Sequence, residues 1–491
     1  MDVLIIGAGL SGIGAAVHLT KDCPDRTYRI VEGRDAIGGT WDLFRYPGIR
    51  SDSDMHTLGY NFKPWTEAKA IADGPNIRAY VNDTADEYGV REHIQFSTKV
   101  TKANWDSQTD MWTVTLSKDG VEENTTCRFL FMCGGYYDYD KGYLPEFAGY
   151  DDFKGDIIHP QHWPENLDYS GKRVVIIGSG ATAMTLVPAM TDKAAKVTML
   201  QRSPTYVVSR PGTDKVANGL RKILPDSWAY GLVRWRNVLL QKFFYNQTRT
   251  KPEKVKERML GMARKELGDE TVEKHFTPSY NPWDQRLCLV PDGDLFEAIR
   301  NGKADVVTDH IERFTETGIA LKSGEVLEAD IIVTATGLNL LFMNGVDVTT
   351  DGADVRGGDL LNYKGVMVSN VPNLAITFGY TNASWTLKAD ITSMYVCRLL
   401  NHMKVGGYTH ATPYLSAMPN ETEPFVVDFS SGYFDRAMDQ FPRQHTQKPW
   451  RLNQNYTMDR KILLNEPIDD GVMRFGVADV QDAKRALEVA D

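Results

Sequence analysis

The chain begins with Asp2-Val3-Leu4-Ile5-Ile6-Gly7-Ala8-Gly9-Leu10-Ser11-Gly12, a short apolar run that ends in a glycine-rich turn. The same pattern returns about 170 residues later in Arg173-Val174-Val175-Ile176-Ile177-Gly178-Ser179-Gly180-Ala181-Thr182-Ala183. An apolar run without alternation is typical of a strand that is buried on both faces, as in a parallel sheet. A strand, a glycine turn and a run of helix formers together begin a βαβ unit. The two segments therefore predict an α/β fold with two doubly wound, Rossmann-like domains.

The rest of the chain adds further strands and one helical region. At 491 residues, it exceeds the length at which a single hydrophobic core stops growing. Residues 128–135 and 329–337 are two more candidates for buried strands, and both end in glycine. Between Lys215 and Glu270 glycines are sparse and apolar residues recur at near-helical spacing, which predicts a helical insertion. We expect one domain from 1–143 and 340–491, a second from 144–212 and 271–339, and the insertion at 213–270.

Aromatic residues are frequent in the expected insertion, namely Trp228, Trp235, Phe243, Phe244 and Tyr245. At helical spacing, such residues usually form a packed core face, and this is the interpretation that we favour. An apolar face for membrane contact or substrate access is the alternative.

Composition and charge exclude some classes of protein. The net charge of −10 argues against nucleic acid as a partner, because binding it depends on clustered positive charge. The sequence has no basic leader followed by an apolar core and no run of about 20 apolar residues, so we expect a cytoplasmic protein without a transmembrane segment. Peripheral membrane contact stays open. Five scattered cysteines show no metal-type or redox spacing, and we expect reduced, structural thiols and no metal site: Cys23, Cys127, Cys133, Cys288 and Cys397.

The first glycine turn has the full pattern of a dinucleotide-binding site. Gly7 allows the tight turn, Gly9 lets the backbone approach a pyrophosphate, and Gly12 lets the helix pack closely on the strand. The helix N-terminus offers free N–H groups to the phosphates. Glu32, 20 residues after Gly12, ends the next expected strand, where its carboxylate accepts hydrogen bonds from ribose hydroxyls and repels a 2′-phosphate. The pattern predicts FAD or NAD; a glycine turn that binds nothing is the alternative.

The second glycine turn differs in the charge that follows it. Where an acid would favour NAD, the sequence has Gln201-Arg202-Ser203, with Arg202 lying 19 residues after Ala183. A guanidinium and a hydroxyl group there are suited to the 2′-phosphate of NADP. The alternative is an ordinary surface arginine. The residues of the turn that we expect to contact NADPH, together with Arg202 and Ser203, are Gly178, Ser179, Gly180, Ala181, Thr182 and Ala183.

Between the two sites lies Phe153-Lys154-Gly155-Asp156-Ile157-Ile158-His159-Pro160-Gln161-His162-Trp163-Pro164, which fits FxGxxxHxxxWP at every fixed position. This motif resembles the signature of the Baeyer–Villiger monooxygenases, flavoenzymes related to the N- and S-oxygenating flavin monooxygenases. In that family, the segment joins the two nucleotide domains. We therefore expect His159 to couple the domains, and we do not expect it to act as a general base.

Other segments extend the resemblance over essentially the whole chain. Gly38-Gly39-Thr40-Trp41 resembles the FAD-contacting loop of flavin monooxygenases, which favours FAD at the first site. Residues 45–52 look like the family's RYPGxRxD segment, and residues 280–291 are similar to the segment that carries its active-site arginine. With residues 382–390 and 449–456, the chain closely resembles the ethionamide-activating subgroup.

The resemblance implies a reaction. NADPH reduces FAD, the reduced flavin captures O2 as a flavin peroxide, and the peroxide adds to a ketone and leaves one oxygen in an ester or lactone. A protonated peroxide instead oxygenates sulfur, so sulfides and thioamides are further expected substrates. The physiological substrate and the oligomeric state are left open.

The resemblance and the chemistry also assign residues. Arg286 is the expected fixed cation near the flavin, because it stabilises the peroxide anion and the oxyanion of the adduct, and Asp52 is its expected partner. Arg50 and Ser51 are expected to touch NADP, and Ser11 and Thr40 the FAD phosphates. The family resemblance alone places Asp42 beside the flavin ring and Val100 against the adenine. Gly39 and Trp41 complete the expected FAD contacts.

Three alternatives to a Baeyer–Villiger enzyme are open at this point. An N- or S-oxygenating flavin monooxygenase shares both nucleotide sites. A disulfide reductase requires two neighbouring cysteines beside the flavin, and the sequence has none. A flavin-binding sensor without turnover would leave Arg202, Asp52 and Arg286 without a common purpose.

Overall fold

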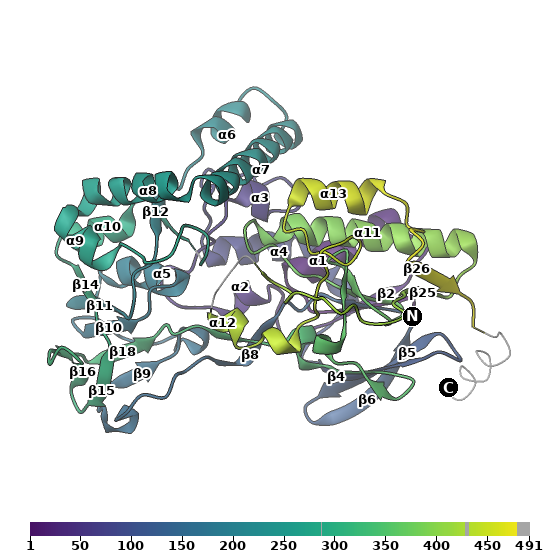
Figure 1. The fold of residues 1–491 in the computed structure, drawn as a ribbon, viewed down its shortest axis with the longest axis horizontal. Helices are drawn as coiled ribbons and strands as arrows, with labels where there is room; N and C mark the ends of the chain where they lie inside the picture. Colours follow the sequence, from purple (N-terminus) through teal and green to yellow (C-terminus); the bar gives the residue numbers. More distant parts are fainter. Residues whose placement is uncertain (286, 428–431, 479–491) are drawn as a thin grey trace.

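The computed structural model describes residues 1–285, 287–427 and 432–478 (Figure 1). Its first core is a five-stranded, all-parallel sheet in the order β24-β7-β1-β2-β3. The strands are β1 (Val3–Ile6), β2 (Tyr28–Val31), β3 (Ile94–Gln95), β7 (Phe129–Met132) and β24 (Leu374–Ile376). Every residue of β1 and β7 is buried, as the continuous apolar runs predict. Helix α1 (Leu10–Asp22) follows β1 and packs against α11 (Trp385–Gly406) from the far end of the chain.

A second all-parallel sheet repeats this design in the order β14-β11-β10-β18-β9. Its strands are β9 (Asp156–Ile158), β10 (Arg173–Ile177), β11 (Lys196–Gln201), β14 (Ala304–Thr308) and β18 (Ile331–Thr334). Helix α5 (Ala181–Met190) follows β10 as α1 follows β1. The predicted α/β fold with two Rossmann-like units is confirmed, whereas the domain bounds stay a prediction.

The two sheets are linked by crossing strands. β8 (Tyr137–Gly142) and β19 (Leu338–Leu340) pair antiparallel where the chain passes from one unit to the other and back. The other strands form smaller sheets: β4 (Lys99–Asp106), β5 (Met111–Lys118), β6 (Val121–Cys127), β20 (Asp347–Thr350) and β21 (Ala353–Asp354); β12 (Val207–Arg210) and β13 (Cys288–Pro291); β15 (Ile311–Thr315), β16 (Gly318–Leu321) and β17 (Val326–Glu328); β22 (Asn362–Tyr363) and β23 (Met367–Val368); β25 (His410–Pro413) and β26 (Met473–Gly476).

The insertion is helical, as predicted, and it separates β12 from β13. It comprises α6 (Lys215–Leu220), α7 (Asp226–Thr250), α8 (Pro252–Leu267) and α9 (Asp269–His275). In Figure 1, α6 and one end of α7 project above the body of the molecule. The other helices are α2 (Thr40–Leu43), α3 (Met55–Leu58), α4 (Gly74–Glu87), α10 (Asp294–Arg300), α12 (Gly432–Asp435) and α13 (Tyr456–Asn465).

The aromatic face of α7 differs from the favoured interpretation. Trp228, Trp235 and Phe243 are 69%, 42% and 63% exposed, so the prediction of a packed core face is wrong for these three residues. Phe244 and Tyr245 are half-buried, and both rings contact Trp283 edge-on. In the part of the chain that the structure describes, each helix is too short or too polar to cross a membrane.

Candidate active site

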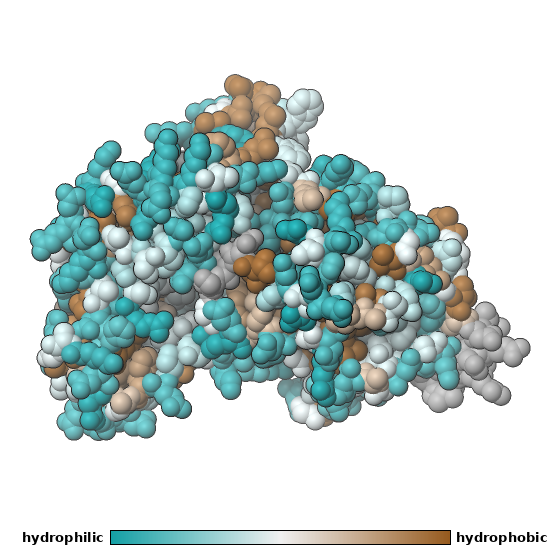
Figure 2. All heavy atoms as spheres, in the orientation of Figure 1, coloured by the Kyte–Doolittle hydropathy of each residue, from teal (hydrophilic) through white to brown (hydrophobic). Residues whose placement is uncertain are grey.

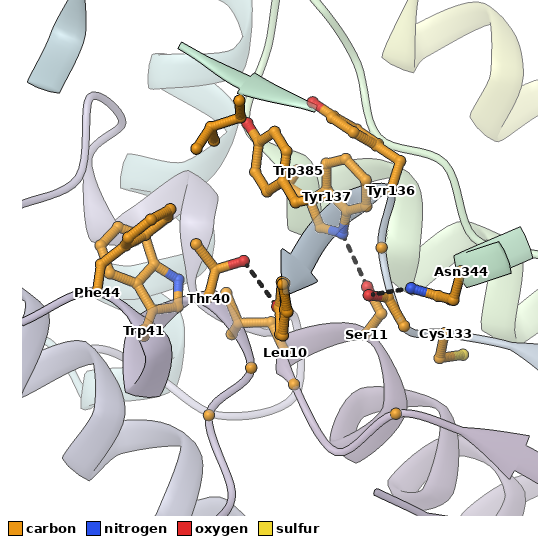
Figure 3. Close-up of a pocket in the computed structure, with 18 of the residues that line it drawn as sticks. Leu10, Ser11, Thr40, Trp41, Phe44, Cys133, Tyr136, Tyr137, Asn344 and Trp385 are labelled. Carbon is orange, nitrogen blue, oxygen red and sulfur yellow. Dashed lines mark hydrogen bonds between the residues drawn. The ribbon is translucent and has the colours of Figure 1, made fainter. Parts of the chain in front are cut away.

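The first glycine turn, together with Ala181 and Thr182 just after the second, lines one cavity of about 530 Å³ between the two units (Figure 3). Its wall includes residues of β1 and the turn that follows it, of the loop before α3, of β8 and of the start of α5. Thirteen of the residues predicted from the sequence line it: Gly7, Gly9, Ser11, Glu32, Gly39, Thr40, Trp41, Arg50, Ser51, Asp52, Val100, Ala181 and Thr182. The cavity therefore brings the expected FAD and NADP loops together.

Gly12 sets the close approach of α1 to β1. A Cβ atom at this position would lie 1.8 Å from the Gly7 carbonyl oxygen, so no larger residue fits without moving backbone. The first turn of α1 has no acidic residue, and its N-cap, Gly9, offers no side-chain acceptor. The first N–H groups of α1 are consequently without a side-chain cap, as an anion-binding helix N-terminus requires. This geometry fits a pyrophosphate.

Glu32 lies at the end of β2 and faces the same cavity. Its carboxylate accepts hydrogen bonds from the backbone N–H groups of Ala8 at 2.7 Å and Arg34 at 2.8 Å. Burial raises the pKa of Glu32, while these two hydrogen bonds lower it. The carboxylate is thereby held beside the glycine turn, in the position from which it would accept hydrogen bonds from a ribose.

Asp42 does not line the cavity, unlike its neighbours Thr40 and Trp41. It is buried, and its carboxylate accepts hydrogen bonds from the guanidinium groups of Arg34 and Arg45, both at 2.6 Å, and of Arg78 at 3.3 Å. Arg34 does line the cavity. In this structure, Asp42 therefore orients Arg34 rather than reaching the cavity itself.

The second glycine turn repeats one hydrogen bond of the first. The Gly178 N–H donates to the Leu200 carbonyl at 2.8 Å, as the Gly7 N–H donates to Val31 at 2.8 Å. The residue after Leu200 is Gln201, which is neutral and turned inward, where its amide donates to the His275 carbonyl and to Thr308. The place that Glu32 holds in the first unit is thus uncharged in the second.

Arg202 and Ser203 follow Gln201 and are exposed. The Ser179 hydroxyl donates to the Ser203 carbonyl at 3.3 Å, so the two loops touch. A Cβ on Gly180 would have nothing within 4 Å, which leaves open space above this turn. Of the predicted NADP residues, Gly178, Ser179, Gly180, Ala183, Arg202 and Ser203 lie outside the cavity wall. The second glycine turn and Arg202 border solvent. A nucleotide that is bound there would therefore have its 2′-phosphate end near the surface of the protein.

The loop of residues 45–52 joins the two units. Gly48 packs on α5, where a Cβ would lie 2.6 Å from the Cβ of Ala189. Arg50 forms an ion pair with Asp294 at the start of α10. The loop is held by the second unit at these two points while Asp52 lines the cavity. Arg286, the expected partner of Asp52, lies outside the described residues, so this pairing stays a prediction.

Three contacts in the wall were not predicted from the sequence (Figure 3). The Trp385 indole N–H donates to the Ser11 hydroxyl at 2.8 Å, and the Asn344 amide donates to the Gly134 carbonyl at 3.0 Å. The Tyr139 and Thr40 hydroxyls lie 3.1 Å apart. Each joins a glycine-rich loop to a residue that is distant in the sequence. Trp385 lies in the segment 382–390 that supported the family resemblance, but nothing in that segment indicates that its indole N–H reaches Ser11. Tyr139 and Asn344 lie in no motif that we identified in the sequence.

His159 stands where the chain crosses between the units. Its Nε2–H donates to the Gly337 carbonyl at 3.1 Å, and its Nδ1 accepts the Gln161 N–H at 3.3 Å. The Tyr143 N–H also donates to the Gly337 carbonyl. Burial lowers the pKa of His159, which keeps the ring neutral in this arrangement. These contacts support a coupling role for His159 and give it no free nitrogen for proton transfer.

We expect His159→Ala to lower the free energy of unfolding by about 1–3 kcal/mol. The Gln161 N–H would lose its acceptor, and the Gly337 carbonyl would lose one of its two donors. His159→Gln keeps a donor and should retain substrate turnover within about threefold. Removing a general base would instead cost about 100-fold or more. Denaturant unfolding and steady-state kinetics of both variants check this expectation, and a loss of that size in His159→Gln would contradict it.

The fold and the cavity define a protein with two dinucleotide-binding units that face each other. The chain matches the family model of flavin-binding monooxygenase-like proteins over residues 66–378, and that of an NAD(P)-binding Rossmann-like domain over residues 5–74. It belongs to the flavin-binding monooxygenase-like family, and the resemblance predicted from its motifs is confirmed.

Relatives match over nearly their full length. The chain is 54% identical over 477 residues to the FAD-containing monooxygenase EthA of Mycobacterium tuberculosis, covering 97% of each chain. It is 51% identical over 478 residues to the probable FAD-binding monooxygenase AlmA of Acinetobacter baylyi, covering 97% of this chain and 96% of that one. Among solved structures, oxidized steroid monooxygenase bound to NADP has the same fold, with a TM-score of 0.76, 22% identity, and coverage of 97% of this chain and 99% of that one. The open crystal structure of cyclohexanone monooxygenase gives a TM-score of 0.73 at 21% identity, covering 84% of this chain and 89% of that one.

Proposed function

We propose that this protein is an NADPH- and O2-dependent, FAD-containing monooxygenase that inserts an oxygen atom beside a ketone carbonyl and so forms an ester or lactone. The observation that carries the proposal is one cavity lined both by the first glycine turn and by the start of α5, which follows the second turn, with Asp52 in its wall. The overall reaction consumes one ketone, one O2, one NADPH and one proton, and it yields the ester, NADP⁺ and water.

The cavity fits the two nucleotides in different ways. Gly7, Gly9 and the uncapped start of α1 would hold the FAD pyrophosphate, with Glu32 on the ribose. The start of α5 and the exposed Arg202 would hold NADPH, with the guanidinium on the 2′-phosphate. When bound, the reduced flavin supplies the activation of O2 and the transfer of one oxygen atom.

We assign two tasks to side chains of the proposed site, namely stabilising negative charge and limiting the access of water. Arg286 is the proposed cation beside the reacting oxygen atoms, and Asp52 would hold it in place. Trp385, Tyr136 and Phe44 give the cavity apolar walls, which limit water and suit an apolar ketone or sulfide. The proposed substrates are small ketones, with sulfides and thioamides as further substrates.

The cavity does not favour disulfide chemistry. Of the five cysteines, all of which are described, buried and outside any disulfide, Cys133 alone lines the cavity wall. Burial raises the pKa of the Cys133 thiol to about 12, so the thiol stays protonated near neutral pH. A reductase would need a second thiol within reach of this one.

The test is product analysis of the FAD-loaded protein with NADPH and ¹⁸O2, supplied separately with a linear methyl ketone and with a thioether. We expect an ester that carries one ¹⁸O atom, formed in proportion to the NADPH consumed. A sulfoxide without any ester would assign the protein to the N- and S-oxygenating enzymes. Hydrogen peroxide as the sole product from every substrate would overturn the proposal.

Asp52→Asn is expected to lower kcat for ester formation by about 10–100-fold, because the amide removes the negative charge that would hold the Arg286 side chain. NADPH consumption without ester should rise in proportion. Asp140→Asn is the matched control, since Asp140 lines the same cavity but is exposed and pairs with Lys99. Equal ester yields in both variants would show that Asp52 has no role in ester formation.

A further inference from the structure

The outward face of α7 is apolar along most of its length. Trp228, Leu232, Trp235, Leu239 and Phe243, here named the α7 stripe, are all exposed. Their spacing of three and four residues places them on one side of the helix, over about 22 Å at 1.5 Å per residue. Figure 2 shows apolar residues gathered at the projecting tip formed by α6 and α7. Surface helices normally turn such a stripe inward.

The inward face of α7 is firmly held, so the stripe is exposed by the fold itself. The buried Arg234 guanidinium donates to the carbonyls of His56 at 2.9 Å and Gly59 at 2.7 Å, and it pairs with Asp390 at 3.1 Å. Tyr230 donates to the Tyr60 carbonyl at 2.9 Å. Turning the stripe inward would break this network, and a buried charge that loses its partners is costly.

The stripe is surrounded by positive charge in an acidic protein. Residues 212–251 contain eight lysines and arginines and two aspartates; without Arg234 and Arg249, which pair with Asp390 and Asp284 outside the segment, the net charge is still +4, whereas the whole chain carries −10. Lys215, Lys222 and Lys251 are exposed and form no ion pair within the described residues. On the neighbouring α13, the Arg460 guanidinium lies over the Trp235 ring at 5.4 Å.

This combination selects one kind of partner. A second copy of the chain would bring its own positive face against this one, and like charges oppose that pairing. Aromatic and leucine side chains flanked by lysines are instead suited to an interface between acyl chains and anionic headgroups. We propose that α6 and α7 dock the protein on anionic lipid bilayers, with the α7 stripe among the headgroups and the lysines on lipid phosphates.

Docking there would also place the proposed site near the bilayer. A second cavity of about 150 Å³ lies between α7 and residues 453–457. Val238 and Tyr245 of α7 line it, and Ala383 lines both this cavity and the large one. An approach to the large cavity would then lie beside the lipid, where apolar molecules concentrate. The delivery of substrate rests on the proposed function, whereas docking itself does not.

The test is co-flotation of the FAD-loaded protein with vesicles of phosphatidylcholine, with and without phosphatidylglycerol. We expect binding to the anionic vesicles that weakens with salt. The pair Trp228→Ser and Phe243→Ser should lower the partition coefficient about tenfold or more. Reversing Lys215, Lys222 and Lys251 to glutamate should remove the preference for anionic lipid. NADPH oxidation in free solution should be unchanged in all variants.

Matched controls are Val405→Ser and Val121→Ser, since these side chains are 90% and 71% exposed but lie outside α6 and α7. They should bind vesicles as the unchanged protein does. Failure to bind anionic vesicles, or an equal loss in the controls, would overturn the proposal. A concentration-dependent dimer in light scattering that the stripe variants abolish would also overturn it, because a second copy would then cover the stripe.

Discussion

Gly12→Val is expected to yield a chain that neither folds nor retains flavin. The Cβ would lie 1.8 Å from the Gly7 carbonyl oxygen, 3.0 Å from the Gly7 carbonyl carbon and 3.5 Å from Ile5. Two of these three atoms belong to the backbone, so a rotamer change relieves nothing and α1 must move off β1. Overpacking that can relax already costs about 1–3 kcal/mol, out of a total stability of about 5–15 kcal/mol.

The measurements are the yield of soluble protein, its bound flavin absorbance and its far-ultraviolet circular dichroism. Gly261→Ala is the matched control, because Gly261 lies inside α8 and a Cβ there meets nothing within 4 Å. The control should be as stable as the unchanged protein or gain up to about 1 kcal/mol from helix propensity. A folded Gly12→Val protein with bound flavin would show that the approach of α1 to β1 is not needed.

Arg202→Glu is expected to lower kcat/KM for NADPH about 1000-fold and to leave kcat/KM for NADH within about threefold. Losing a charge-assisted contact with a phosphate costs about 1.5–3 kcal/mol, and the new carboxylate adds repulsion. Arg202 is exposed, and the neighbouring Gln201 is neutral and turned inside the protein, where its Nε2 donates to the His275 carbonyl and to Thr308, so Gln201 cannot take over the charge.

Arg202→Ala separates the two causes. It should lose about 10–150-fold for NADPH, without the additional effect of repulsion. Lys196→Ala is the control, since Lys196 carries the same charge at the opposite end of β11 and pairs with Asp305. Equal losses for NADPH and NADH in Arg202→Glu would mean that this residue does not read the 2′-phosphate.

The parts of the site that could be predicted from the sequence are those formed by residues close together in the chain. A glycine turn, its helix and the acid at the end of the next strand follow from residues that are close in sequence, and Glu32 lies beside its turn as expected. The partners of these loops are not local. Trp385 reaches Ser11 across 374 residues, and Asn344 reaches Gly134 across 210. Nothing in a single sequence indicates such a pairing, because it depends on how the two ends of the chain meet.

The predicted orientation of α7 was wrong, and the error has a physical cause. The spacing of apolar residues locates an apolar stripe on a helix, but it assigns charged residues such as arginine to the exposed face. Here Arg234 is buried because carbonyls of residues 56–59 and the Asp390 carboxylate satisfy it from distant parts of the chain. Those partners turn Val233 and Val238 inward with it and leave Trp228 outside.

The pairing of β7 with β24 has a consequence for the synthesis of the protein. β7 ends at Met132 and β24 begins at Leu374, so 241 residues are made between them. At about 5–20 residues per second, a nascent chain spends roughly 10–50 s with the apolar edge of β7 unpaired. Such an edge is a template for pairing with other chains. The yield of native protein should therefore depend on the speed of the ribosome and on the chaperones that meet the first half of the chain.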